Sequence, residues 1–304
     1  MTARAVVFAY HDVGVRCLQV LLSAGVAVPL VVTHQDDPNE SQWFASVAAT
    51  ARERDLPVIT PADAGGAALA TQIAALHPDF LFSFYYRSML GEPLLAIPRR
   101  GALNMHGSLL PKYRGRAPVN WALLNGERET GATLHHMVAR ADAGDIVDQQ
   151  SVPILRDDDA RQVFNKVTVA AELVLARVLP ALLAGTAPRR PQSIEPGQYF
   201  GRRRPEDGRI DFRRPAPDIH NLVRAVAPPF PGAFTDIAGS RWWIHRTHIE
   251  PTAVPPGSAR LFTKAGRCYI ACRDGGVLRV LAAANEGGPI AFHSLPDGFE
   301  KRLD

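Results

Sequence analysis

The chain has 304 residues, 46% of them hydrophobic and 21% charged, with a formal net charge of +4. This ordinary balance excludes a disordered or fibrous protein, and the length suits two domains with a substantial buried core. The mild positive charge is compatible with an anionic small molecule or with nucleic acid, and it does not separate the two.

Short apolar runs alternate with helical patterns through the first part of the chain. Buried strands are predicted at Ala5–Tyr10, Val28–Thr33, Pro57–Ile59 and Phe80–Tyr85, and helices at Val13–Ala24, Ser41–Arg54 and Ala67–Leu76. Continuous apolar strands separated by helices indicate a mostly parallel sheet that is covered on both faces. We therefore expect an α/β fold with a Rossmann-like N-terminal domain over residues 1–187.

The pattern changes in the middle of the chain. A short strand is predicted at Ala102–His106, a helix from Pro118, a hairpin from Thr130–Val138 and Ile146–Pro153, and a long helix after Asp157–Asp159. Prolines and arginines then indicate a linker over residues 188–208. Short strands punctuated by glycines follow, which predicts a small OB-like β-barrel domain over residues 209–304.

Several familiar site types are excluded by their missing motifs. GxGxxG does not follow the first strand, and GxxxxGK[ST], HExxH, paired CxxC and GxSxG do not occur. His135 and His136 are adjacent and would point to opposite faces of a strand, so joint metal ligation is not expected. Cys17, Cys268 and Cys272 are predicted to be packed thiols. No metal site is expected.

No segment reaches about 18 uninterrupted apolar residues, and the N-terminus lacks the form of a signal peptide. The sequence therefore predicts a soluble, cytoplasmic protein that is not inserted in a membrane.

Asn104 and His106 are two residues apart at the predicted carboxyl end of a strand, where open α/β sheets bind ligands. Acyl transfer to an amine needs a proton carrier and a donor to an oxyanion, which histidine and the asparagine amide can supply. Asp142, in the turn after the next strand, could orient the imidazole and stabilise its charge. On the pattern alone, such an Asn-x-His pair at a strand end is more often a hydrogen-bonded structural pair.

The flanking residues carry a resemblance. The runs N-M-H-G-S-L-L-P-K-Y-R-G-R-A-P from Asn104, T-G-A-T-L-H from Thr130 and R-A-D-A-G-D-I from Arg140 resemble the signature of folate-dependent formyltransferases. The resemblance implies that Asn104, His106 and Asp142 are catalytic and that 10-formyltetrahydrofolate is the donor. It also implies a folate pocket, formed largely by backbone groups, which comprises Ser88, Met89, Leu90, Arg116, Val138, Ala139, Arg140, Ala141 and Asp142.

Other details bear on the amine acceptor. The segments Phe82–Arg87 (F-S-F-Y-Y-R) and Phe200–Arg203 (F-G-R-R), together with the sequence His106-Gly107-Ser108, are similar to the formyltransferase domains of bifunctional polymyxin-resistance proteins. Those domains formylate UDP-4-amino-4-deoxy-L-arabinose for the modification of lipid A. The resemblance implies a nucleotide-sugar acceptor here, with candidate contacts from Tyr10, Arg114, Phe200, Arg202 and Arg203.

Alternatives remain open. Methionyl-tRNA formyltransferases resemble the chain over its whole length, although their first strand usually continues into a G-T-P-like turn where this chain has Phe8–Gly14 (F-A-Y-H-D-V-G). Another nucleotide amino sugar, such as a dTDP-sugar, would use the same donor. A formyl hydrolase and a folate-binding regulatory module are further possibilities. The resemblance also allows a homo-oligomer or fusion to a decarboxylase.

Overall fold

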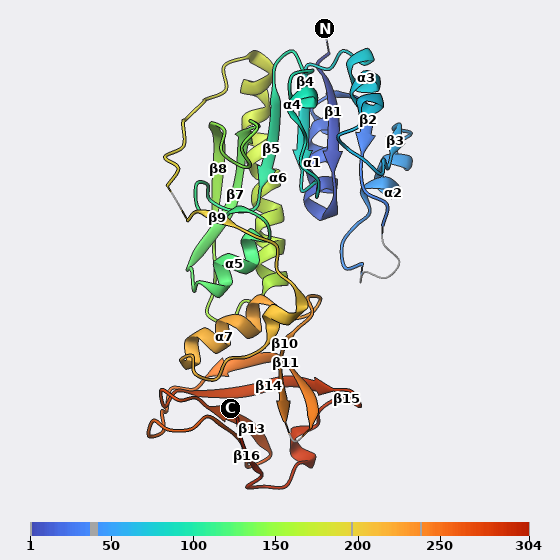
Figure 1. Ribbon diagram of the computed structural model, residues 1–304. Coiled ribbons are helices and arrows are strands. Elements are labelled where there is room, and N and C mark those ends of the chain that lie inside the picture. Colours follow the sequence, from blue (N-terminus) through green and yellow to red (C-terminus); the bar gives the residue numbers. More distant parts are fainter. Residues whose placement is uncertain (1, 37–41, 196, 238, 304) are drawn as a thin grey trace. The chain divides into compact units, whose positions relative to one another are not determined.

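The computed structural model describes residues 2–36, 42–195, 197–237 and 239–303 (Figure 1). The chain divides into two compact units, and each is described by itself. Unit 1 comprises Met1–Pro118, Thr130–Val152 and Asn165–Phe200. Unit 2 comprises Val119–Glu129, Pro153–Phe164 and Gly201–Asp304. The chain therefore passes between the units several times, which differs from the single linker expected at residues 188–208.

Unit 1 is built on one mixed sheet with the strand order β3-β2-β1-β4-β5-β7-β8 (Figure 1). Its strands are β1 (Arg4–Ala9), β2 (Ala27–Val32), β3 (Val58–Ile59), β4 (Phe80–Phe84), β5 (Ala102–His106), β7 (Glu129–His136) and β8 (Ile146–Pro153). The first five strands pair in parallel, and β7 pairs with β5 in the antiparallel direction. All five residues of β4 are buried, as expected of a strand covered on both faces.

Helices connect the parallel strands of unit 1. They are α1 (His11–Ser23), α2 (Val47–Arg52), α3 (Ala67–Ala75) and α4 (Glu92–Leu95). Helix α2 is shorter than the predicted Ser41–Arg54, since it begins after Ser46, whose hydroxyl oxygen accepts from the backbone N–H of Ala49 at 3.3 Å. Ser41 itself lies outside the described residues. The expected Rossmann-like, mostly parallel α/β fold is confirmed.

The long helix α6 (Ala160–Ala184) follows β8. It is the one helix, within the described part of the chain, that is long and apolar enough to cross a membrane. Half of its most apolar window is buried inside the structure, and Val167, Val174 and Leu175 contribute to the core. One face of this helix therefore packs inside the protein.

Unit 2 contains an antiparallel sheet with the order β10-β11-β14-β13-β12-β16, with β15 paired to β14. Its elements are α5 (Pro118–Leu124), η1 (Pro205–Gly208), α7 (Ala216–Ala225), β10 (Ala233–Ile237), β11 (Ser240–Ile249), β12 (Arg260–Lys264), β13 (Arg267–Ala271), β14 (Val277–Asn285), β15 (Gly288–Pro289), η2 (Phe292–Ser294) and β16 (Glu300–Arg302). Helix α7 packs against β11 through a core that includes Ile219, Val223 and Ile244. The expected small C-terminal β-domain is confirmed.

A two-stranded parallel ribbon completes unit 1. It pairs β6 (Arg114–Gly115) with β9 (Tyr199–Phe200). The backbone N–H of Arg114 donates to the carbonyl of Gln198 at 3.0 Å, and that of Arg116 donates to Phe200 at 2.9 Å. These bonds explain why residues 188–200, the first part of the predicted linker, belong to unit 1.

Candidate active site

The site begins where β5 ends beside β7. The antiparallel register places Asn104 opposite His135 and His106 opposite Thr133. The side chains of Asn104 and His106 leave the same face of β5, because they are two residues apart. The pairing with β7 therefore adds His135, which is 1% exposed, to the two residues that the sequence had singled out.

Asp142 lies in the turn between β7 and β8, with a backbone φ of 49°. This left-handed conformation is uncommon for residues other than glycine and persists only where the surroundings hold it. Two residues later, a Cβ at Gly144 would overlap the carbonyl of His136, so the turn needs glycine at that position. Steric crowding within the turn thus explains why the A-D-A-G-D sequence has glycine two residues after Asp142.

The side chain of Gln192 holds this turn from outside. Its Nε2 donates to the carbonyl of Asp142 at 3.1 Å and to that of Gly144 at 2.6 Å. Nearby, Arg190 and Ile146 exchange two backbone hydrogen bonds of 2.9 and 2.8 Å. The segment before β9 is therefore attached to the Asp142 turn.

Both ring nitrogens of His106 have partners. Its Nε2 lies 2.8 Å from the carbonyl oxygen of Tyr113, and its Nδ1 lies 3.5 Å from Asp142 Oδ1. A carbonyl oxygen only accepts, so Nε2 carries a proton. Protonation at Nδ1 would place an imidazolium against the Asp142 carboxylate, an arrangement that stabilises the charged ring.

Asn104 and His135 meet at the same carboxylate. Asn104 Nδ2 lies 3.1 Å from His135 Nε2 and donates to Asp142 Oδ1 at 3.2 Å. His135 Nδ1 donates to the carbonyl of His136 at 2.8 Å, so a neutral His135 accepts from Asn104 through Nε2. A protonated His135 would instead donate to Asp142 Oδ1, 3.4 Å away. The Asn104 amide is thus directed inward in this arrangement.

Asp142 is the anionic centre of the group. Burial by itself would raise the pKa of its carboxyl, but the charges of His106 and His135 and hydrogen bonds from His135 and Gly115 outweigh burial. The net result is a pKa well below the ordinary carboxyl value. Asp142 therefore stays ionised at neutral pH.

The two-stranded ribbon of β6 and β9 supplies one of the hydrogen bonds that Asp142 accepts. The backbone N–H of Gly115 donates to Asp142 Oδ2 at 2.9 Å. Gly115 has a φ of 98°, and a Cβ there would overlap the carbonyl of Phe200. The glycine of the R-G-R sequence is therefore required for the loop to approach Asp142.

The residues expected to bind folate lie mostly at the surface of unit 1. Met89 is 61% exposed and Val138 46% exposed, so both side chains offer apolar contact area at the surface. Leu90, in contrast, is buried in the core of unit 1. Arg116 is exposed and donates to the carbonyl of Arg87 at 3.3 Å. The remaining predicted residues are exposed or half-buried: Ser88, Ala139, Arg140 and Ala141.

The predicted acceptor contacts in unit 1 have different environments. Tyr10 is 3% exposed, and its ring contacts His34, Phe44 and the Arg87 guanidinium, so packing within the protein occupies it. Phe200 is half-buried against the ring of Tyr113, 4.9 Å between centroids.

Arg114 is 2% exposed, and its Nε is buried without a hydrogen-bond partner among the described residues. Burial and the nearby Arg140 lower its pKa, while Asp142 and Tyr199 act in the opposite direction. A buried guanidinium with an unused donor is costly unless a partner satisfies it.

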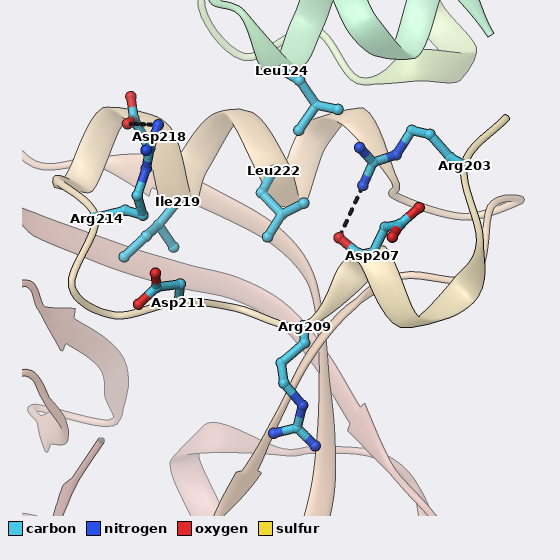
Figure 2. Close-up of a pocket in the computed structure, with 9 residues that line it drawn as sticks. All are labelled: Leu124, Arg203, Asp207, Arg209, Asp211, Arg214, Asp218, Ile219 and Leu222. Atoms are coloured by element: carbon cyan, nitrogen blue, oxygen red, sulfur yellow. Dashed lines mark hydrogen bonds and ion pairs between the residues drawn. The ribbon is translucent and has the colours of Figure 1, made fainter. Parts of the chain in front are cut away.

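Arg202 and Arg203 belong to unit 2. Arg202 is exposed, while Arg203 lies over the ring of Trp121 and donates to the carbonyl of Asp207 at 2.9 Å. Arg203 also lines a cavity of about 190 Å³ beside η1 and α7. Arginines and aspartates make up most of its lining (Figure 2). Both arginines therefore lie in a different unit from the Asp142 site.

Sequence reasoning missed two members of the site. His135 was considered only as a metal ligand, although its place in T-G-A-T-L-H opposite Asn104 could have been inferred once β7 was paired with β5. Gln192 lies 50 residues beyond Asp142, and no local pattern marks it. No cluster in the described residues brings three His, Cys, Asp or Glu side chains into a metal-binding arrangement.

Comparison with known proteins agrees with the geometry. Two of the most similar solved structures are the N-formyltransferase from Helicobacter canadensis, in complex with folinic acid and dTDP-3-aminofucose, and WlaRD, a sugar 3N-formyl transferase. The first has a TM-score of 0.74 and 21% identity, over 92% of this chain and 99% of that one. The second has a TM-score of 0.72 and 20% identity, over 94% and 98%.

A sugar N-formyltransferase from Shewanella has a TM-score of 0.64 and 20% identity, over 81% of this chain and 97% of that one. These likenesses establish a shared fold. The formyl transferase family matches residues 10–179, more than half of the chain, and the C-terminal domain of formyl transferases matches residues 203–292. The chain therefore belongs to the formyl transferase family and is a formyl-transferring enzyme.

Proposed function

We propose that this enzyme transfers a formyl group from 10-formyltetrahydrofolate to the amine of a nucleotide-linked amino sugar in the cytoplasm. The observation that carries the proposal is the Asp142 carboxylate, which is held between His106, His135 and Asn104 in unit 1. A binding module would have no need to keep an ionised carboxylate against two imidazoles beside an amide. Acyl transfer uses such a group for proton movement and for oxyanion stabilisation.

The proposed reaction is a direct displacement. The unprotonated sugar amine attacks the formyl carbon and forms a tetrahedral intermediate, and the bond between that carbon and N10 then breaks. The proton lost by the amine is delivered to the departing N10. His106 moves this proton through Nε2, exchanging the Tyr113 carbonyl for the reacting groups, because Asp142 holds Nδ1.

Asn104 is proposed to donate to the oxyanion. Its Nδ2 now faces His135 and Asp142, so the amide has to turn before it can donate outward. A protonated His135 would then donate to the amide oxygen of Asn104. His135 is thus proposed to support the amide, while Asp142 stabilises the charge on both imidazoles.

Exposed apolar side chains support a folate site in unit 1. Met89 and Val138 offer contact area for a flat ring, and the backbone of residues 88–90 and 138–142 offers polar groups around it. Folinic acid in the Helicobacter relative and 5-formyltetrahydrofolate with WlaRD support the same class of donor.

The acceptor proposal rests on charge and on the relatives. The unused Nε of the buried Arg114 suits an anionic partner, because guanidinium groups bind phosphate through two donors. The Helicobacter relative binds dTDP-3-aminofucose, and WlaRD, a sugar 3N-formyl transferase, was crystallised in the presence of dTDP. We propose UDP-4-amino-4-deoxy-L-arabinose as the specific acceptor, which would place the enzyme in lipid A modification and polymyxin resistance.

One acceptor screen tests the proposal. The purified enzyme with 10-formyltetrahydrofolate is offered the UDP-aminopentose, a dTDP-3-amino sugar and charged initiator tRNA, and formylated product is measured by mass spectrometry. Rapid formylation of the UDP-sugar is expected. Preference for the dTDP-sugar would overturn the specific acceptor and keep the class. Activity on tRNA alone, or folate hydrolysis without a formylated acceptor, would overturn the class as well.

A further inference from the structure

The sequence following His106 contains a glycine that the backbone does not require. Gly107 has no left-handed φ, so its conformation is open to other residues. A Cβ at this position would overlap the phenol oxygen of Tyr85, and it would lie 2.9 Å from Tyr85 Cζ and 3.4 Å from Pro118 Cγ. The phenol of Tyr85 therefore occupies the space that a side chain at position 107 would need.

Tyr85 is itself in an unusual position at the end of β4. Its φ is 59°, a left-handed value that bulky residues rarely adopt. Burial raises the pKa of its phenol, which stays a neutral hydroxyl. The two following residues, in contrast, contact His34. The Tyr86 ring stacks on the His34 ring, 4.1 Å between centroids, and the backbone N–H of Arg87 donates to His34 Nε2 at 3.0 Å. These contacts fix the turn that directs Tyr85 toward Gly107.

The loop from Tyr85 to Leu90 is thus attached to the catalytic segments at two points. One is the packing of Tyr85 on Gly107, next to His106. The other is the hydrogen bond from the Arg116 guanidinium to the carbonyl of Arg87 at 3.3 Å. A shift in either contact would change the distance between the loop and His106.

We propose that Tyr85 is a positioning residue, whose phenol packs on Gly107 and sets the spacing between His106 and the loop at residues 87–90. This inference rests on the proposed function, in which that loop binds the formyl donor and His106 moves the proton. The fit matters because displacement of a reacting group by about 1 Å can cost on the order of 10²-fold in rate.

The test is a double-mutant cycle with Gly107→Ala, Tyr85→Phe and the combined variant. The methyl group of G107A has to displace the phenol or the backbone beside His106, and kcat is expected to fall on the order of 10²-fold. Y85F removes the overlapping oxygen and leaves only the tighter approach to Cζ. The double variant is therefore expected to recover at least about tenfold of the lost kcat, which additive effects would not produce.

Gly91→Ala is the matched control at the other end of the same loop. Its Cβ would meet only Pro93 Cδ at 3.5 Å, an ordinary contact, and its φ is −74°. G91A is expected to keep kcat within about twofold of the unmodified enzyme, and Y85F is expected to give it no benefit. Normal kcat in G107A, or a loss that Y85F does not relieve, would overturn the positioning role.

A second measurement is independent of the acceptor. The imidazole NMR signals of His106 are recorded for each variant at one pH, and thermal stability is measured beside them. G107A is expected to move the His106 ring signals, and added Y85F to return them toward those of the unmodified enzyme, whereas a purely structural change would lower thermal stability alone. If the unmodified enzyme formylates no nucleotide sugar, the proposed function fails, and these ring signals still decide the role of Tyr85.

Discussion

Charged side chains are organised differently in the two units. In unit 1, Asp142 has several partners at once: two imidazoles, an amide and a backbone N–H within 3.5 Å. In unit 2, aspartates pair with arginines at the surface, as in Arg214–Asp218 and Arg209–Asp236. Asp142 therefore has several partners in a largely enclosed group, whereas the side chains of these two aspartates of unit 2 remain more than a third exposed.

The difference indicates where loss of a charge should matter. A buried anion with several partners leaves them all unsatisfied when it is neutralised, whereas an exposed pair returns its members to water. We therefore expect substitutions around Asp142 to change catalysis by orders of magnitude, and those at surface pairs to have small effects. The experiments below test this contrast from the largest expected effect to the smallest.

The largest effect is expected from His106→Ala. Without the imidazole neither the proton transfer nor the charge opposite Asp142 remains, and kcat should fall by about 10³- to 10⁴-fold. Folinic acid affinity should change little, as measured by calorimetry. His248→Ala removes an imidazole that pairs with Asp157 in unit 2 and is the control. Near-normal turnover in H106A would refute the catalytic role.

Asp142→Asn keeps the shape of the side chain and removes its charge. We expect kcat to fall about 10²- to 10³-fold, because the amide no longer stabilises a protonated His106. The control is Asp157→Asn, whose carboxylate is more than half exposed and faces His248. Steady-state kinetics on both variants should differ by at least tenfold. Equal, mild losses would mean that Asp142 serves only to form its turn.

Part of the fold and of the Asp142 site could be predicted from the sequence. Alternating apolar runs and helical patterns predicted the parallel strands, and the two-residue spacing of Asn104 and His106 placed both side chains on one face of a strand. The family signature added Asp142, which no spacing rule connects to the strand end. The strand pattern and the spacing are local features, and the signature is a long ordered motif, so each can be recognised in the sequence alone.

The rest depends on tertiary packing. His135 enters the site only because β7 pairs with β5 in an antiparallel register that sets it opposite Asn104. Gln192 reaches the Asp142 turn from a segment that its prolines and arginines predicted to be a linker. Helix α2 begins at Val47 because the Ser46 side chain caps it, and helix boundaries of this kind are the least predictable part of a sequence pattern.

Gln192→Leu tests whether the Asp142 turn needs support from outside. Leucine keeps the size of the side chain but cannot donate to the carbonyls of Asp142 and Gly144, so the strained turn should relax. We expect kcat to fall about tenfold, since Asp142 would lose its alignment with His106. Gln198→Leu is the control, because within the described residues that side chain accepts from the backbone N–H of the nearby Glu195 and makes no other hydrogen bond. Equal kinetics in the two variants would remove Gln192 from the site.

His11 can be used to test how burial of an imidazole makes the free energy of unfolding depend on pH. Burial and the nearby Arg87 lower its pKa to about 3, so the folded state keeps a neutral ring where the unfolded chain, near pKa 6.5, takes up a proton. Stability is therefore complete above about pH 6.5 and falls as the pH drops toward 3, by about 2 kcal/mol at pH 5. His11→Asn, which tolerates the φ of 66°, should flatten that part of the curve of unfolding free energy against pH.

His77→Asn is the matched control for His11. His77 also has a positive φ, 48°, but its side chain is exposed. Its replacement should leave the slope between pH 5 and 7 as it is in the unmodified protein. If both variants keep the same slope, another group is responsible for the acid sensitivity.

The smallest effect is expected at Arg214–Asp218, one of the surface pairs that line the unit 2 cavity (Figure 2). The two side chains are four residues apart, with 2.7 Å between Arg214 Nη2 and Asp218 Oδ2, and both are more than a third exposed. Asp218→Asn should cost only about 0.3–0.5 kcal/mol in the free energy of unfolding, because water solvates either charge. The loss should shrink further in 0.5 M salt, since screening weakens an exposed pair. Urea denaturation at two salt concentrations measures it. A loss above about 2 kcal/mol that salt does not reduce would show that unit 2 also depends on a convergent charge group, and the contrast between the units would fail.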